Sequence, residues 1–180
     1  AEGESGVGRL VEPEEILASV GRALESRSRF AGLRVVVTAG PTRSSLDPVR
    51  FISNRSSGLM GYSLATAAWR RGGNVILIAG PTIPTPTFGL SLVKVETAGE
   101  MKEALETELM EADILIMAAA VADFEVANVS SAKIKKEASD GLDLSLRPGP
   151  DLLVETKSLR DEKGIFTLGF ALETEDAIEN

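Results

Sequence analysis

The sequence contains neither cysteine nor histidine among its 180 residues. These two absences exclude disulfides, thiolate nucleophiles, Ser/His/Asp triads and the usual zinc ligands. Chemistry on this chain is therefore left to carboxylates, amines, guanidinium groups, amides and the backbone.

Positive charge is also scarce, because 19 Lys and Arg residues stand against 27 Asp and Glu residues, a net charge of −8. A general nucleic-acid surface needs a basic face, so the composition predicts no nucleic-acid partner and only a local anion site. No apolar run approaches the ~18 residues of a membrane span, and no signal segment opens the chain. These features predict a cytoplasmic protein that does not enter a membrane.

Apolar residues, in contrast, make up 43% of the sequence, which is enough for one domain with a substantial core. Four apolar runs are nearly continuous, as in a sheet covered on both faces. These predicted strands are 34–38, 74–79, 113–119 and 165–170. Helical spacing predicts helices over 59–71, 99–110 and 151–160. This alternation indicates an α/β fold, a Rossmann-like, doubly wound, mainly parallel sheet with ligands at the carboxyl ends of its strands.

Local signals mark the helix starts and the connections. Thr97 and Glu100 have capping-box spacing, and Pro150 is placed just inside the start of the last predicted helix. The stretch 83–90 is rich in proline and threonine and predicts a surface loop.

A further helix is predicted over 13–24, because apolar residues recur there at helical spacing after Pro13. The stretch 22–32 that follows is typical of a linker. We interpret 1–32 as a connector from an upstream domain. The alternative is a helix that packs on the sheet of this same domain.

Residues 123–146 depart from the alternation and predict a β-hairpin arm, because leucines at 142, 144 and 146 alternate as on a strand. The arm contains Lys133-Ile134-Lys135-Lys136, the densest basic cluster of the chain. On a strand, Lys133 and Lys135 would share one face. The cluster is either solvated surface or a set of ammonium groups that closes over a polyphosphate and neutralises a leaving pyrophosphate.

The loop Ser56-Ser57-Gly58-Leu59-Met60-Gly61 leads into a predicted helix. Such a loop presents unpaired N–H groups and the positive end of the helix dipole to an anion, although glycines can also simply relieve crowding. Alanines 118–120 leave room for a ligand at the end of the third strand. Asp123 would then lie at the mouth of the site, unless it caps a turn.

A dinucleotide dehydrogenase would share this architecture, but its signals are missing. No Gly-x-Gly-x-x-Gly follows the first strand, where Gly40 precedes Pro41, and no acidic residue ends the second strand at Ala79. Tyr62, the single tyrosine, has no lysine four residues on. These absences disfavour a redox function.

Five motifs occur in a fixed order between 32 and 176. They are Thr38-Ala39-Gly40-Pro41-Thr42-Arg43, Asp47-Pro48-Val49-Arg50-Phe51-Ile52-Ser53-Asn54-Arg55-Ser56-Ser57-Gly58, Ala118-Ala119-Ala120-Val121-Ala122-Asp123-Phe124, Lys133-Ile134-Lys135-Lys136 and Gly169-Phe170-Ala171-Leu172-Glu173-Thr174. Together they resemble phosphopantothenoylcysteine synthetase, the ligase domain of the bacterial bifunctional coenzyme A biosynthesis flavoprotein. The opening, 8–16, resembles the end of the flavin-dependent decarboxylase domain that precedes it. FMN would then belong to that upstream partner and not to this chain.

The resemblance implies a ligase that joins 4′-phosphopantothenate and L-cysteine, using CTP with Mg²⁺. In this family the carboxylate of phosphopantothenate attacks the α-phosphate of CTP, and the amine of cysteine then displaces CMP from the acyl-cytidylate. A homodimer is implied as well, in which Arg50 reaches the substrate phosphate of the neighbouring subunit. The metal ligands stay unknown.

Site residues follow from the same resemblance. Asn54 would hold the carbonyl of the substrate or intermediate, Lys133 would stabilise phosphate charge during activation, and these two with Arg50 are the predicted catalytic residues. The predicted nucleotide-binding residues are Gly40, Ser56, Gly58, Gly61, Met117, Ala118, Ala119, Asp123, Lys133, Pro150, Asp151, Leu152 and Phe170. The predicted substrate-binding residues are Arg50, Asn54, Ala119, Ala120 and Asp123.

The sequence departs from the family at three places. Leu59 stands where many relatives have lysine, and Pro148-Gly149-Pro150-Asp151 stands where they have Lys-Asn-Pro-Asp. A helix is predicted to begin at Thr174, and the family's later nucleotide-contacting lysines have no counterpart before Asn180. We therefore expect 33–180 to be a ligase domain that is incomplete at its carboxyl end. The alternative function is a nucleotide-binding or assembly module without catalysis.

Overall fold

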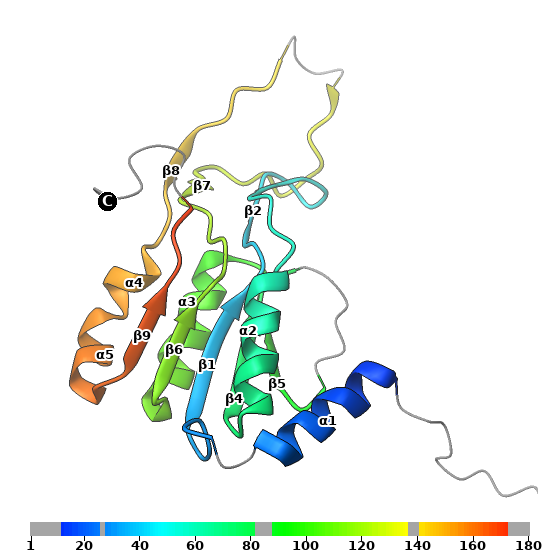
Figure 1. Ribbon diagram of the computed structural model, residues 1–180. Helices are drawn as coiled ribbons and strands as arrows, with labels where there is room; N and C mark the ends of the chain where they lie inside the picture. Colours follow the sequence, from blue (N-terminus) through cyan, green and yellow to red (C-terminus); the bar gives the residue numbers. More distant parts are fainter. Residues whose placement is uncertain (1–11, 26–27, 82–87, 137–140, 173–180) are drawn as a thin grey trace, which may run out of the picture.

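A parallel sheet of five strands, in the order β5-β4-β1-β6-β9, forms the centre of the fold (Figure 1). The computed structural model describes residues 12–25, 28–81, 88–136 and 141–172, so the predicted helix start at Thr174 and the motif from residue 8 to 11 lie outside the described residues. The strands are β1 (Arg34–Ala39), β4 (Asn74–Ala79), β5 (Ser91–Lys94), β6 (Ile114–Met117) and β9 (Phe166–Gly169). The chain builds outward from β1 on one side and then on the other, which confirms the doubly wound α/β fold and places the switch point between β1 and β6.

Four of the five strands fall where continuous apolar sequence predicts them. In β1, residues 35 to 39 are all buried, because helices cover both faces of the sheet there. The exception is β5, which sequence analysis missed. It is an edge strand whose residues are half-buried or exposed, so it shows no continuous apolar run.

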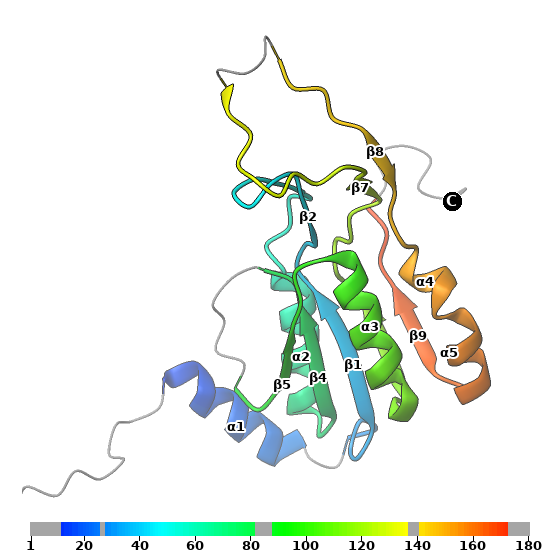
Figure 2. The same ribbon diagram turned by 180° about the vertical axis from the view of Figure 1, so that it is seen from behind.

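Helices cover both faces of the sheet (Figures 1 and 2). Helix α2 (Leu59–Arg70) packs on one face through Ala65 and Ala68. Helix α3 (Ala98–Glu108), the 3-10 turn η1 (Leu109–Glu111), α4 (Leu152–Glu155) and α5 (Lys157–Lys163) lie on the other face. No helix among the described residues has the length and apolar character needed to cross a bilayer.

Helix α1 (Pro13–Glu25) packs on α2 and not directly on the sheet. The Arg70 guanidinium lies 2.8 Å from the Glu25 carboxylate, and the Arg22 guanidinium lies 4.7 Å from the centre of the Trp69 ring. Leu24 stays 81% exposed, so α1 is held by these polar contacts while its apolar stripe remains largely open to solvent. A role of residues 1–32 as a connector stays a prediction.

The helix predicted over 151–160 is wrong as a single helix, because the structure has two short helices, α4 and α5, in its place. Asp151 is the N-cap of α4 and accepts a hydrogen bond from the Val154 N–H at 3.0 Å. Pro150 therefore precedes the cap and is not inside the helix. Thr156, which is buried, separates α4 from α5, and its hydroxyl donates to the Leu152 carbonyl at 2.6 Å. The cap at Thr97, in contrast, is confirmed, because its hydroxyl accepts from the Glu100 N–H at 3.1 Å.

Two small antiparallel pairs stand above the carboxyl ends of the sheet (Figure 1). β2 (Arg43–Ser45) pairs with β3 (Phe51–Ser53), and β7 (Phe124–Val126) pairs with β8 (Leu146–Pro148). The second pair is the base of the predicted arm. The predicted strand over 142–146 is wrong, because only Leu146 pairs, and no strand includes Lys133–Lys136 among the described residues. All described residues of 141–146 are exposed, so no buried face fixes a strand register there.

Gly61 is what lets α2 approach the end of β1. A Cβ at this position would lie 2.6 Å from the Ala39 Cβ and 2.7 Å from the Thr38 carbonyl oxygen. Both are far below contact distance, so a side chain would push the first turn of α2 away from the strand. The start of α2 is thus held against the switch point by the lack of a side chain.

Candidate functional site

The predicted site residues gather at the carboxyl edge of the sheet, beyond β1 and β6. Past the ends of these strands the two segments stay side by side, with an isolated β-bridge between Pro41 and Ala120. The Ala120 N–H donates to the Gly40 carbonyl at 2.8 Å, and Gly40 takes a φ of 78°, which favours glycine. The switch point is therefore closed by main-chain hydrogen bonds at its base.

The buried hydroxyls of Thr38, Thr42 and Ser44 join β1 and the segment after it to the segment after β6, and we refer to them as the hydroxyl ladder. Their oxygens accept, at 2.8 to 3.2 Å, the N–H groups of Ala118, Ala119, Ala122 and Val126. Removing one of these hydroxyls would leave a buried donor unpaired, at a cost of about 1–3 kcal/mol. The ladder also means that Ala118 and Ala119 offer a ligand their carbonyl oxygens and methyl groups, but not their N–H groups.

The start of α2 is built as an anion site. Gly58, with a φ of 72°, is an N-cap that makes no side-chain hydrogen bond, and the first turn carries no acidic residue. Ser56 Oγ accepts from the Gly58 N–H at 3.2 Å, which shapes the loop. Within the described residues, the N–H groups of Met60 and Gly61 make no hydrogen bond. These donors and the helix dipole favour a phosphate.

Asn54 bridges the β3 end and the switch point. Its Nδ2 donates to the Val121 carbonyl at 2.9 Å and more weakly to the Ala120 carbonyl at 3.4 Å. Its Oδ1 has no partner in the described part of the chain. The side chain is therefore anchored by its donor while its acceptor stays available.

The predicted nucleotide-binding segments meet at the other side of β6. The Phe170 N–H donates to the Met117 carbonyl at 3.2 Å, and the Gly149 N–H donates to the Asp123 carbonyl at 2.8 Å. Asp123 and Phe170 are exposed at this edge. Leu152, in contrast, is buried in the core, and the Asp151 carboxylate is committed to capping α4. These last two side chains shape the site from behind.

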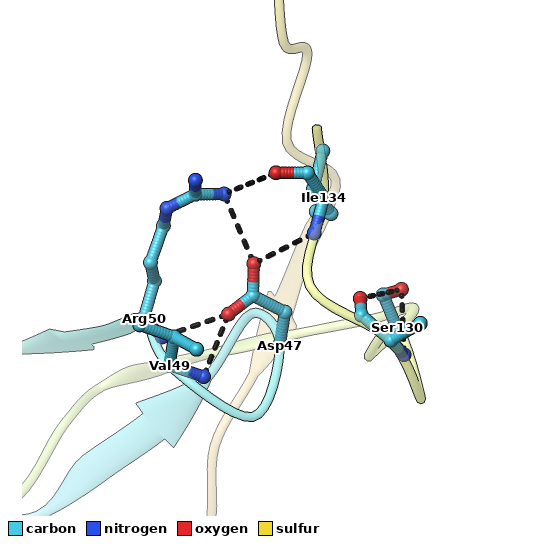
Figure 3. Close-up of polar contacts among 6 residues, drawn as sticks. Asp47, Val49, Arg50, Ser130 and Ile134 are labelled. Carbon is cyan, nitrogen blue, oxygen red and sulfur yellow. Dashed lines mark hydrogen bonds and ion pairs between the residues drawn. The ribbon is translucent and has the colours of Figure 1, made fainter. Parts of the chain in front are cut away.

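Arg50 and the lysine cluster meet around the buried side chain of Asp47 (Figure 3). Asp47 Oδ1 accepts from the N–H groups of Val49 and Arg50, both at 2.8 Å. Its Oδ2 accepts from Arg50 Nη1 at 3.0 Å and from the Ile134 N–H at 3.1 Å. Arg50 Nη1 also donates to the Ile134 carbonyl at 3.1 Å. We refer to Asp47, Arg50 and Ile134 as the Asp47 clasp.

The clasp stabilises the ionised form of its carboxyl group. Burial alone would raise the pKa of Asp47, but hydrogen bonds from the N–H groups of Val49, Ile134 and Arg50, together with the Arg50 charge, outweigh it and hold the pKa below 3.8. The group binds its proton more weakly in the folded chain. Its contribution to stability is therefore present above about pH 3.8 and lost as the pH falls through the lowered pKa.

Sequence analysis missed Asp47 and the hydroxyl ladder. The Asp47-Pro48 step is a turn signal, but nothing local points to Ile134, which lies 87 positions away. The ladder is hidden for the same reason, since each hydroxyl meets a donor about 80 positions later. Among the described residues, no group of three or more acidic side chains could hold a metal ion.

A cavity of about 340 Å³ lies at the opposite, amino-terminal edge of the sheet. Arg22, Arg34, Trp69 and Glu108 are among its lining residues. Both arginines are already engaged, Arg34 with Glu108 at 2.7 Å and Arg22 with the Gly73 carbonyl at 3.1 Å. None of the predicted site residues lines this cavity.

Comparison with known proteins identifies the family. Residues 30–180 match the family described as DNA/pantothenate metabolism flavoprotein C-terminal domain. The chain is 41% identical over 180 residues to the Coenzyme A biosynthesis bifunctional protein CoaBC of Escherichia coli (strain K12), covering 98% of this chain and 44% of that protein. The chain thus spans less than half the length of that curated relative.

Solved structures give the same result for the fold. The C-terminal domain of a Coenzyme A biosynthesis bifunctional protein CoaBC is similar with a TM-score of 0.70 and 37% identity, over 82% of this chain and 68% of that one. A mutant of Cab2 in complex with phosphopantothenate-cysteine is similar with a TM-score of 0.58 and 19% identity, over 93% of this chain and 82% of that one. The second likeness concerns the fold alone.

Proposed function

Because this chain belongs to the family described as DNA/pantothenate metabolism flavoprotein C-terminal domain, we propose that it joins 4′-phosphopantothenate to L-cysteine, using CTP, in coenzyme A biosynthesis. The observation that carries the proposal is the meeting of the open α2 start with Asn54 and Asp123 at one switch point. The start of α2 suits a triphosphate. Asn54 and Asp123 suit the acyl group and the amine to which that group is transferred. The names of the CoaBC and Cab2 relatives support the choice of substrates.

In the first step, a carboxylate oxygen of phosphopantothenate attacks the α-phosphorus of CTP. The bond between that phosphorus and the bridging oxygen to the β-phosphate breaks, and pyrophosphate leaves. The N–H groups at the start of α2 hold the phosphates, and the Lys133 ammonium offsets the charge that the pyrophosphate gains. Fixed donors of this kind act most strongly on charge that develops during reaction.

In the second step, the amine nitrogen of cysteine attacks the acyl carbonyl carbon. The bond to the CMP oxygen breaks, and the amine gives up its proton to the phosphate of the departing CMP. Asn54 Oδ1, which stays available because Nδ2 is anchored on the Val121 carbonyl, accepts a hydrogen bond from the incoming amine. This aligns nucleophile and carbonyl without any covalent enzyme intermediate.

Magnesium and flavin have different places in this proposal. The described residues contain no group of acidic side chains able to cage a cation, so Mg²⁺ would arrive held mainly by the phosphate oxygens of CTP. Bound there, it would neutralise phosphate charge. FMN would belong to the additional length of the bifunctional relatives.

Label transfer tests the proposal directly. With phosphopantothenate, cysteine, Mg²⁺ and CTP labelled in its α-phosphate, we expect a labelled phosphopantothenoyl adduct, one pyrophosphate per product, and faster pyrophosphate release with CTP than with ATP. Binding of CTP without label transfer would favour a nucleotide-binding module instead. The absence of any binding would overturn both.

We also propose a homodimer, in which Arg50 serves the neighbouring subunit. Large apolar side chains are exposed around Arg50 and on the arm, among them Val49, Phe51, Phe124 and Val129. A surface of this kind is typical of an interface. Light scattering at micromolar concentration is expected to give twice the chain mass, and a strict monomer would refute the sharing of Arg50.

A further inference from the structure

We propose that Asp47 is a positioning residue, which holds Arg50 and the lysine segment Lys133–Lys136 in one fixed arrangement through its Oδ2 atom. The inference rests on the proposed ligase function, because it concerns the same site. It adds a residue that the family resemblance did not assign to any role.

The two carboxylate oxygens of Asp47 have separate tasks. Oδ1 binds only the N–H groups of its own turn, at Val49 and Arg50. Oδ2 binds only groups that belong to the clasp, Arg50 Nη1 and the Ile134 N–H. Because Arg50 Nη1 also reaches the Ile134 carbonyl, the three residues form a closed ring of hydrogen bonds (Figure 3).

This ring is the main-chain anchor of the lysine segment. In the described part of the chain, Lys133–Lys136 pairs with no strand, and its only hydrogen bonds to other elements are those of Ile134. The Asp47 side chain is 0% exposed, so these bonds form away from competing water. The position of the Lys133 backbone therefore depends on Asp47, together with the Ser130 N–H, which donates to the Leu46 carbonyl at 2.9 Å three residues earlier.

The charged groups that the ring positions stay free to act. The Arg50 side chain is 42% exposed, and its second terminal nitrogen points away from Asp47 (Figure 3). Lys133, directly before Ile134, is exposed. A single buried anion thus orients two cations that face outward, the arrangement needed to receive two phosphate groups at a set distance.

Asp47→Asn separates the two tasks. An asparagine can keep the turn by accepting both turn hydrogens with its oxygen. Its NH₂ group then stands where Arg50 Nη1 and the Ile134 N–H both need an acceptor, so the ring opens. If the amide flipped, its NH₂ group would instead face the N–H groups of Val49 and Arg50 in the turn, so two sets of donors would again meet without an acceptor. In either case the isosteric change removes the cross-link and leaves the volume unchanged.

We expect Asp47→Asn to lower kcat for product formation from CTP about 10- to 100-fold and to raise KM for phosphopantothenate, since small misplacements of reacting groups have effects of this size. Combined with Lys133→Gln, it should lower kcat little further, because both changes remove the same action of Lys133, whereas the rise in KM, which reflects Arg50, should remain. Asp113→Asn is the matched control. That carboxylate accepts the Arg34 N–H at 2.8 Å on the opposite edge of the sheet, and this variant should keep normal kinetics.

Trypsin gives a readout that does not depend on activity. Cleavage after Lys133, Lys135 and Lys136, followed by mass spectrometry, should be at least about tenfold faster in Asp47→Asn than in wild type or Asp113→Asn, as expected when a local anchor is lost. Ile134→Pro is a second variant, because it removes one donor of the ring and leaves Asp47 and its turn intact. It should shift the kinetics, and the cleavage after Lys135 and Lys136, in the same direction, whereas the Lys133–Pro bond resists trypsin; a melting temperature is measured for each variant.

The outcomes separate this inference from the proposed function. If wild type makes no product but Asp47→Asn still speeds cleavage, the ligase assignment fails and the anchoring by Asp47 stands. If wild type is active and Asp47→Asn keeps kcat and KM within twofold, or if its effect on kcat simply multiplies with that of Lys133→Gln, the positioning role is refuted.

Discussion

Lys133→Gln is expected to slow pyrophosphate release from CTP by about two to three orders of magnitude, the usual loss when a pre-positioned charge partner is removed. Glutamine keeps most of the length of the side chain but cannot offset the charge that builds on the leaving pyrophosphate. The Asp47 clasp fixes the chain at the next residue, Ile134, so no neighbouring ammonium should replace the lost one easily. A rapid-quench measurement of the first turnover would isolate this step from the second.

Two further variants sharpen this test. Lys163→Gln removes an exposed lysine at the end of α5 and should leave the first turnover unchanged. Lys133→Arg keeps the charge and should recover part of the rate. A burst of pyrophosphate in Lys133→Gln equal to that of wild type would show that Lys133 takes no part in activation.

Asn54→Ala should give the second large effect, an accumulated acyl-cytidylate with product formation slowed by about 100-fold, because the amine loses its alignment. Activation should proceed, since the start of α2, where we propose that the phosphates bind, is untouched. Loss of the side chain also frees the Val121 carbonyl that Asn54 now holds at 2.9 Å. Mass spectrometry of quenched reactions without and with cysteine would detect the intermediate and its consumption.

Asn74→Ala provides the comparison for this variant. Asn74 begins β4 at the far edge of the sheet and is exposed, so its loss should alter neither step. Product formation at the normal rate by Asn54→Ala, with no intermediate, would remove Asn54 from the mechanism.

The sequence predicted the parts of the fold in which burial dominates. The apolar runs of β1, β4 and β6 read directly as strands, because their residues are buried in the two cores of the sheet. The edge strand β9 was also found from its apolar run, although three of its four residues are exposed. The edge strand β5 gave no such signal, since three of its four residues are exposed and the other is half-buried. The break at Thr156 was equally hidden, because one buried hydroxyl bonded to Leu152 decides it.

The site was predictable where the chemistry is local. The glycine loop at the start of α2 could be identified from its own residues, and the geometry there agrees with an anion site. The lysine segment was expected on a strand, but its partners are the side chains of Asp47 and Arg50 and not another strand. Contacts between positions so far apart leave no pattern in the residues between them. The assigned roles of the individual site residues stay predictions.

The hydroxyl ladder affects the order in which parts of the protein fold. Each rung joins groups separated by about 80 positions, so none can close until the intervening β4, β5 and α3 have been accommodated. Long loop closure is slow compared with local helix formation. The rim that carries the proposed site is therefore expected to mature later than the local helices, because its hydrogen bonds join segments that lie far apart along the chain.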